Sequence, residues 1–130
     1  MMYLDTDVLL AFLKRDDWLK SAVDRDALED PVTSTATVIE IYYVLGDEWS
    51  AVQLADVRAR VETQGVGFVP LTPQHMDATG RLRTKYDRLG VFDAVHLGVA
   101  LTEGEPIVST DTLYPEIDEV AHLDPRDVAG

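Results

Sequence analysis

Four acidic residues stand at positions of this sequence where acidic side chains are unusual. Asp5 directly follows a short apolar run, and Glu40 is the only charged residue between positions 36 and 45. Asp93 opens the most apolar helix-like stretch, and Asp111 follows an apolar run and two hydroxyl residues. Carboxylates gathered in one place oppose each other's ionisation, and a hard divalent cation relieves that conflict. If the four converge, they predict an all-oxygen Mg²⁺ or Mn²⁺ site that could activate water for phosphodiester cleavage.

The elements expected around these acids explain why they should converge. Short apolar runs alternate with helical stretches, a pattern typical of an α/β fold with a mainly parallel sheet. Ligands of such sheets bind outside the carboxyl ends of the strands, and Asp5 and Asp111 are expected at two of these ends. Glu40 and Asp93 lie at or near expected helix N-termini, which can point at the same edge. The sequence therefore predicts one site at one edge of the sheet.

The pattern gives approximate bounds for each element. The expected strands cover residues 2–4, 32–34, 67–71, 106–109 and 120–123. The expected helices cover residues 8–14, 18–28, 35–45, 51–63, 73–88 and 93–101. Asp16 or Asp17 would cap the second helix, and Gly65 and Gly104 would end two others. No internal repeat or linker is evident, so one domain over residues 1–130 is expected.

Each of the four acids also has a purely structural interpretation. Asp5 could cap the first helix, and Thr37 with Glu40 matches a capping box. Asp93 could be the N-cap of its helix, and Asp111 could begin an Asx-turn. Taken singly these structural roles are the simpler interpretation, but four such coincidences in one chain favour a site.

Composition limits the classes of function. The chain has 130 residues with 24 acidic and 11 basic side chains, a net charge of −13, which argues against a generic basic nucleic-acid-binding domain. Asp is twice as frequent as Glu and only three lysines occur, as expected of a halophilic source. Cysteine is absent, which excludes disulfides and thiolate metal sites. The longest apolar run has six residues and no basic leader precedes it, so a soluble cytoplasmic protein without membrane contact is expected.

Basic residues and histidines add two open questions. Residues 58–88 hold six of the 11 basic side chains, and four of these could form a rim that binds RNA phosphates: Arg81, Arg83, Lys85 and Arg88. An ordinary solvated helix face explains them equally well. His96 lies three residues after Asp93 and could face the same edge, but a buried structural role is expected for it.

Four segments in order resemble the motifs of the PIN-domain ribonucleases, and among these the VapC-like toxins of type II toxin–antitoxin pairs. They are residues 3–9 (YLDTDVL), 34–40 (STATVIE), 92–100 (FDAVHLGVA) and 108–114 (VSTDTLY). Together they extend over nearly the whole chain. Asp7 departs from the family pattern, because Asn or Ser is usual at that position.

The resemblance implies a three-layer α/β/α fold with four or five central strands and a metal-dependent endoribonuclease activity. Mg²⁺ or Mn²⁺ would be held by the four catalytic carboxylates: Asp5, Glu40, Asp93 and Asp111. An activated water would then hydrolyse an RNA phosphodiester bond. Thr6, Asp7 and Ser109 would orient the ligands or water. The resemblance also implies a homodimer and a small antitoxin as partners.

Two alternatives remain open at this point. Residues 5–9 also resemble the first motif of haloacid-dehalogenase-like phosphatases, with Asp5 as nucleophile and Asp7 as general acid/base. That chemistry would need Ser34 to bind phosphate and a cation such as Lys85 to neutralise it. The second alternative is a non-catalytic PIN-like module that binds RNA or protein.

Overall fold

The computed structural model of the chain describes residues 1–128 and shows five short strands in one sheet. The strands are β1 (Met2–Leu4), β2 (Pro31–Ser34), β3 (Gly67–Val69), β4 (Ile107–Val108) and β5 (His122–Leu123). Their order is β3-β2-β1-β4-β5, and all four neighbouring pairs are parallel. The predicted α/β fold with a parallel sheet is therefore confirmed.

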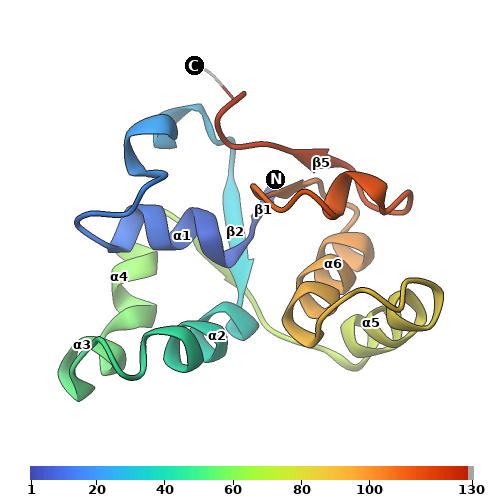
Figure 1. Cartoon of the computed structure of the whole chain (residues 1–130), viewed down its shortest axis with the longest axis horizontal. Coiled ribbons are helices and arrows are strands. Elements are labelled where there is room, and N and C mark those ends of the chain that lie inside the picture. Colours follow the sequence, from blue (N-terminus) through green and yellow to red (C-terminus); the bar gives the residue numbers. More distant parts are fainter. Residues whose placement is uncertain (129–130) are drawn as a thin grey trace.

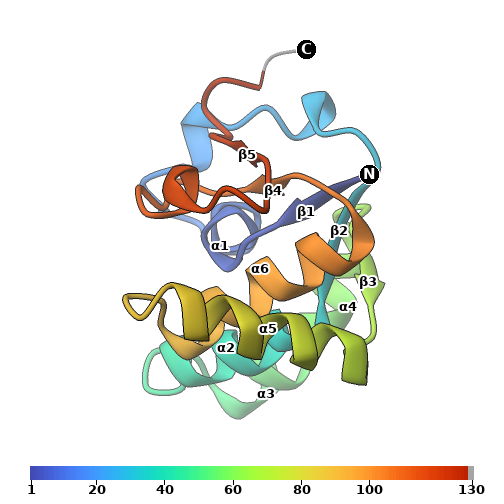
Figure 2. The same ribbon diagram turned by 90° about the vertical axis from the view of Figure 1, so that its right-hand side faces the viewer.

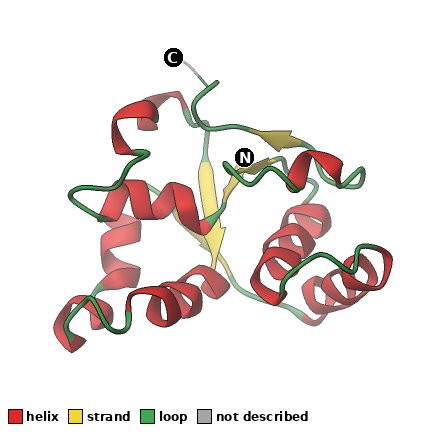
Figure 3. Cartoon of the chain, in the orientation of Figure 1, coloured by secondary structure: helices red, strands yellow, loops and turns green. Residues whose placement is uncertain are grey.

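Over residues 1–128, six α-helices and three 3-10 turns surround this sheet (Figures 1 and 3). The helices are α1 (Thr6–Leu13), α2 (Thr35–Leu45), α3 (Ala51–Ala55), α4 (Val57–Thr63), α5 (Pro73–Lys85) and α6 (Val91–Glu103). The 3-10 turns are η1 (Lys20–Ala22), η2 (Arg25–Ala27) and η3 (Tyr114–Glu116). Within residues 1–128, every helix is too short or too polar to cross a membrane.

Alternation of side chains along the strands produces the three layers. Tyr3 and Ile107 point into a hydrophobic cluster with residues of α5 and α6. Leu4 and Val108, the next residue of each strand, belong to the opposite cluster with α1, α2 and α4. Figures 1 and 2 show these two groups of helices on opposite sides of the strands. The sheet is thus buried on both faces, as parallel sheets require.

Strand order creates a crevice beside β1. From β1 the chain moves outward to β2 and β3 on one side, whereas β4 and β5 lie on the other side. The order therefore reverses between β1 and β4, and ligands of open α/β sheets bind at such a switch point. Asp5 follows β1 and Ser109 follows β4, so both residues lie at this crevice.

The helix predicted over residues 18–28 is wrong, because this segment forms η1 and η2 instead. Two aspartates compete locally for backbone donors: Asp17 accepts a hydrogen bond from the Leu19 N–H, and Asp24 accepts one from the Asp26 N–H. Such local bonds favour turns over continuous helix. Only Leu19 and Leu28 are buried here, which is too little apolar surface to stabilise a full helix.

Other elements differ from the prediction mainly in their bounds. The helix predicted over 51–63 breaks at Asp56, because α3 buries no side chain whereas α4 turns Val57 and Val61 into the core. The third strand stops at Val69, since Pro70 follows and has no N–H to donate. The fifth helix ends at Lys85 rather than at residue 88.

The last large helix begins earlier than predicted. Gly90 precedes α6 as its N-cap, so Asp93 lies in the first turn of the helix and does not cap it. Glu40 likewise forms no capping box, because Ser34 is the N-cap of α2 and Glu40 lies one and a half turns inside. Two of the four acids therefore have no capping role in the fold.

Candidate active site

Asp5 lies at the base of the crevice, between β1 and α1. One carboxylate oxygen, Oδ1, accepts a hydrogen bond of 2.8 Å from the Thr6 N–H, which caps α1. The other, Oδ2, accepts one of 2.8 Å from the Ser109 hydroxyl at the end of β4. Burial raises the pKa of Asp5, and the charge of Glu40 raises it further, against the effect of His96 and the two hydrogen bonds. The capping role and a place in the site thus coexist in Asp5.

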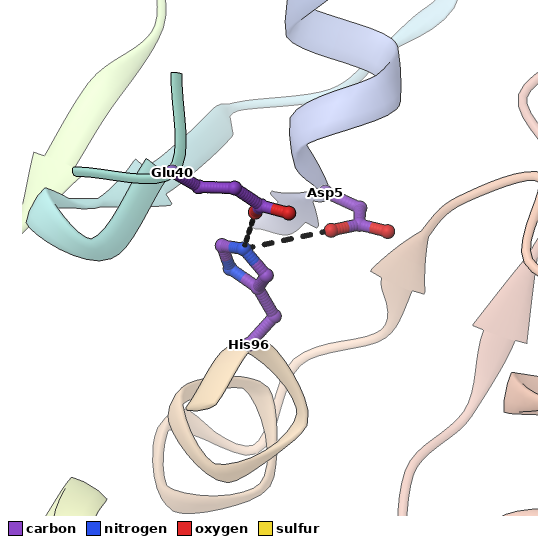
Figure 4. Close-up of side chains that lie close together, drawn as sticks. All are labelled: Asp5, Glu40 and His96. Carbon is purple, nitrogen blue, oxygen red and sulfur yellow. Dashed lines mark hydrogen bonds and ion pairs between the residues drawn. The ribbon is translucent and has the colours of Figure 1, made fainter. Parts of the chain in front are cut away.

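Glu40 and His96 reach the same point from α2 and α6. The Nε2 atom of His96 lies 2.7 Å from Glu40 Oε1 and 3.6 Å from Asp5 Oδ1. Figure 4 shows the three side chains pointing toward one another from separate elements. The Thr6 hydroxyl also donates a hydrogen bond to Glu40 Oε1. One ligand atom from each of Asp5, Glu40 and His96 lies within 4.8 Å of the others, so the three could hold a metal ion.

The negative charge of Glu40 and the positive charge of His96 stabilise each other. Burial alone would raise the pKa of Glu40, but hydrogen bonds and charge from His96 and a hydrogen bond from Thr6 lower it below its usual value. Burial alone would lower the pKa of His96, but its contacts with Tyr3, Glu40 and Asp5 raise it well above the usual 6.5. His96 joins this cluster, although a buried structural role was expected for it from the sequence. Its position three residues after Asp93 was the only signal, since residues at that spacing share one helix face.

Asp93 and Asp111 lie beside this cluster rather than in it. Among residues 1–128, the group that could share one ion comprises Asp5, Glu40 and His96 and includes neither of these acids. Asp93 accepts a hydrogen bond of 3.1 Å from the Tyr114 hydroxyl. Burial raises the pKa of Asp93, and the charges of Asp111 and Glu40 raise it further, against the Tyr114 hydrogen bond and the charge of His96.

The loop after β4 is tied to α1 by Asp7. Its Oδ2 atom accepts hydrogen bonds from the backbone N–H and the hydroxyl of Thr110. Asp111 forms the expected Asx-turn, since its Oδ1 accepts a hydrogen bond of 2.8 Å from the Leu113 N–H. Its own N–H donates to the Ser109 hydroxyl at 3.0 Å. Asp7 and Ser109 therefore touch the residues around the proposed ligands, and Asp7 holds the Asp111 loop in place.

The basic residues proposed to bind RNA lie along and after α5. Arg81, Arg83 and Lys85 are exposed on this helix, and Arg88 is exposed in the loop that follows. Lys85 pairs with Glu119 at 3.4 Å and Arg88 pairs with Glu116 at 3.2 Å. Within the described part of the chain, Arg81 and Arg83 form no ion pair, and Arg81 lines an open cavity of about 640 Å³.

Comparison with known proteins gives one family and a consistent set of folds. The profile of the PIN domain family matches residues 2–120. No curated protein sequence matches the chain.

Three solved structures illustrate the structural similarity. DNA-bound VapBC from Salmonella typhimurium superposes with a TM-score of 0.75 at 18% identity, covering 95% of this chain and 96% of that one. VapBC2 from Rickettsia felis, bound to a promoter DNA fragment, superposes with a TM-score of 0.73 at 15% identity, covering 95% of this chain and 98% of that one. FitAcB from Neisseria gonorrhoeae superposes with a TM-score of 0.69 at 18% identity, covering 98% of this chain and 99% of that one. At these identities the similarity concerns the fold.

Proposed function

The chain belongs to the PIN domain family, and from this premise we propose that it is a divalent-metal-dependent endoribonuclease, the toxin of a toxin–antitoxin pair. One observation supports the proposal: Asp5, directly after β1, and Glu40 of α2 gather at the switch point of the sheet, and Asp93 and Asp111 lie beside them. We further propose that residues 1–130 form a single nuclease domain.

The donor set fits a divalent cation. Burial of Asp5 and Asp93 raises the pKa of both carboxyls, so their charged forms lack sufficient compensation from the protein alone. A bound Mg²⁺ or Mn²⁺ would supply that compensation, lower the pKa of water and neutralise charge on a phosphodiester. Asp5 and Glu40 would hold the ion directly, and Asp93 and Asp111 would complete the site from the side where substrate enters.

The neighbouring hydroxyl groups orient these carboxylates. Ser109 donates to Oδ2 of Asp5, and Oδ1 faces His96. Thr6 donates to Glu40 and so fixes the carboxylate that α2 extends across the crevice. Groups held in this way are preorganised, and loss of such a partner typically lowers metal affinity about 10- to 100-fold.

Carboxylate substitutions test the proposal. Asp5→Asn and Asp93→Asn should each abolish cleavage of an RNA oligomer in the presence of Mg²⁺ or Mn²⁺, because the ion loses a charged neighbour. Circular dichroism and gel filtration should show that both variants remain folded. Asp77→Asn, on the exposed face of α5, is the matched control and should cleave normally. Full activity of folded Asp93→Asn would refute the assignment.

The phosphatase alternative lacks its supporting groups. The Ser34 hydroxyl is engaged with the Tyr3 hydroxyl at 2.8 Å and caps α2, so it is not free to bind phosphate. Lys85 lies on α5 and pairs with Glu119. For the non-catalytic alternative, the wild-type chain in the same assay is decisive, because a binding module would show no metal-dependent cleavage at all.

An exposed apolar face supports the proposed partners. Four adjoining side chains of α2 leave 44–82% of their surface exposed: Ile39, Tyr42, Tyr43 and Val44. The ring centroid of Tyr43 lies 6.3 Å from that of Phe92 of α6, so the apolar face continues onto a second helix. Apolar surface gathered in this way is typical of protein interfaces. We therefore propose a homodimer and a small antitoxin, with RNA as substrate and a halophilic cytoplasm as the working environment.

A further inference from the structure

A buried histidine occupies the centre of a site that four carboxylates alone were expected to form. His96 is 0% exposed, and both of its ring nitrogens have polar neighbours. Two of its neighbours, Asp5 and Glu40, are carboxylates, and the third is the Tyr3 hydroxyl. The following inference rests on the proposed function, because it concerns the ion that this function requires.

The outward-facing nitrogen is placed as a metal ligand would be. Adjacent ligands of an octahedral ion at about 2.1 Å lie about 3 Å apart. His96 Nε2 lies 2.7 Å from Glu40 Oε1 and 3.6 Å from Asp5 Oδ1, which brackets that spacing. All three atoms belong to one group within 4.8 Å. Small shifts of the Glu40 side chain, which is 20% exposed, would bring the three atoms to a common ion.

The inward-facing nitrogen has a hydrogen-bond partner, as metal-binding histidines almost always do. Nδ1 lies 2.6 Å from the Tyr3 hydroxyl, which in turn lies 2.8 Å from the Ser34 hydroxyl. A bound ion would displace the Nε2 proton; with the Nδ1 N–H donating to Tyr3 and Tyr3 donating to Ser34, the freed Nε2 lone pair then faces the carboxylates. Ser34 can accept this bond, because a hydroxyl oxygen has two lone pairs and the Ala36 N–H uses only one of them. A hydrogen bond of this kind fixes both the tautomer and the ring orientation of ligating histidines.

We propose that His96 Nε2 is a direct ligand of the ion beside Asp5 and Glu40, and that Tyr3 is its positioning residue. The site is then a mixed nitrogen–oxygen site rather than an all-carboxylate one. Imidazole suits first-row transition ions better than it suits Mg²⁺, which prefers oxygen ligands and retained waters. The chain should therefore bind Mn²⁺ more tightly than Mg²⁺, and His96 should be the source of that preference.

Mn²⁺ itself is the probe for the first test. Electron spin-echo envelope modulation of Mn²⁺ bound to the metal-free full chain should show coupling to a ¹⁴N nucleus. The signal should vanish in His96→Gln and persist in His75→Gln. His75 is the matched control, because it is also buried but lies on α5, and glutamine can keep its place in the capping box with Thr72.

Affinities provide the second readout. His96→Gln should weaken Mn²⁺ binding at least about tenfold and Mg²⁺ binding by much less. Tyr3→Phe should keep the ¹⁴N coupling but weaken Mn²⁺ binding about tenfold, because the ring loses its orienting partner.

The possible outcomes separate this inference from the proposed function. Wild-type protein that binds Mn²⁺ without ¹⁴N coupling would overturn the role of His96 and leave the nuclease proposal standing. In that case His96 serves only as a hydrogen-bond donor to Glu40. Wild-type protein that binds no Mn²⁺ at all would overturn both. The wild-type spectrum decides the question even if His96→Gln fails to fold.

Discussion

Replacing Asp7 with asparagine should stabilise the metal-free fold at neutral pH and lose much of that effect in mild acid. Burial first, and the negative charge of Asp5 second, raise the pKa of Asp7 to about 6. Hydrogen bonds from Thr110 and from the Val8 N–H oppose the rise but do not cancel it. The ionised form of this carboxyl is therefore disfavoured in the folded chain relative to the unfolded one.

The sign and size of the effect follow from the linkage between protonation and folding. An unfolded chain releases the Asp7 proton near its ordinary pKa of 3.8, whereas the folded chain holds it until about pH 6. Between these values the folded state binds more protons, so the free energy of unfolding falls as pH rises and stays low above the window. The loss amounts to on the order of 3 kcal/mol at neutral pH and about 1 kcal/mol near pH 4.5.

Asparagine removes the ionisation but not all of the hydrogen bonds. Its carbonyl oxygen can accept both bonds from Thr110, while its amide group would face the Val8 N–H and lose that bond. One lost hydrogen bond costs about 1 kcal/mol. We therefore expect a net stabilisation of about 2 kcal/mol near pH 7.5 and about none near pH 4.5.

Urea unfolding in the presence of EDTA measures this difference. Tryptophan fluorescence can follow the transition, since the chain has Trp18 and Trp49. Asp26→Asn, at an exposed aspartate of η2, is the control and should change stability little at either pH. A variant with asparagine at position 7 that is less stable than wild type near pH 7.5, or equally stabilised at both pH values, would refute the reasoning.

Two further predictions concern surfaces away from the carboxylates. The double variant Arg81→Glu/Arg83→Glu should weaken binding of single-stranded RNA in EDTA and reduce the salt slope by about 0.7 per lost phosphate contact, measured by fluorescence anisotropy. An unchanged slope would make α5 an ordinary solvated face, and Arg58→Glu on α4 is the control. Tyr43→Ser should shift sedimentation from dimer toward monomer, whereas Val52→Ser, equally exposed on α3, should not. Identical sedimentation of the Tyr43 variant would contradict the proposed interface.

The framework of the fold could be predicted because its signals are local. The apolar run of β1 and the glycine after α6 each specify one boundary, and the structure keeps them. The segment 18–28 could not be predicted in the same way. Its apolar spacing resembles a helix, but Asp17 and Asp24 bind nearby backbone N–H groups instead. The balance between these two tendencies depends on how much surface the segment buries, which the sequence does not reveal.

The site shows the same division between local and distant information. Positions after β1 and β4 identified Asp5 and Asp111 as residues at one edge of the sheet. The role of His96 was hidden, because a histidine in an apolar helix has the same sequence pattern whether it fills the core or faces a carboxylate. What distinguishes the two is the pairing of His96 with Tyr3 and Glu40, which lie 93 and 56 positions away along the chain. Only the packing of α6 against β1 and α2 reveals it.

The placement of the acids also explains how so negative a chain could act on RNA. Burial raises the pKa of Asp5, Asp7 and Asp93, so these carboxyls oppose folding at neutral pH unless a cation joins them. Ionisable groups whose pKa values are shifted in this way are concentrated at functional sites. The remaining surface charge repels RNA over a distance that shrinks to about 3 Å in 1 M salt. On the proposed function, net charge would govern how readily RNA approaches at a given salt concentration, whereas the cation at the switch point would govern whether the bound strand is cut.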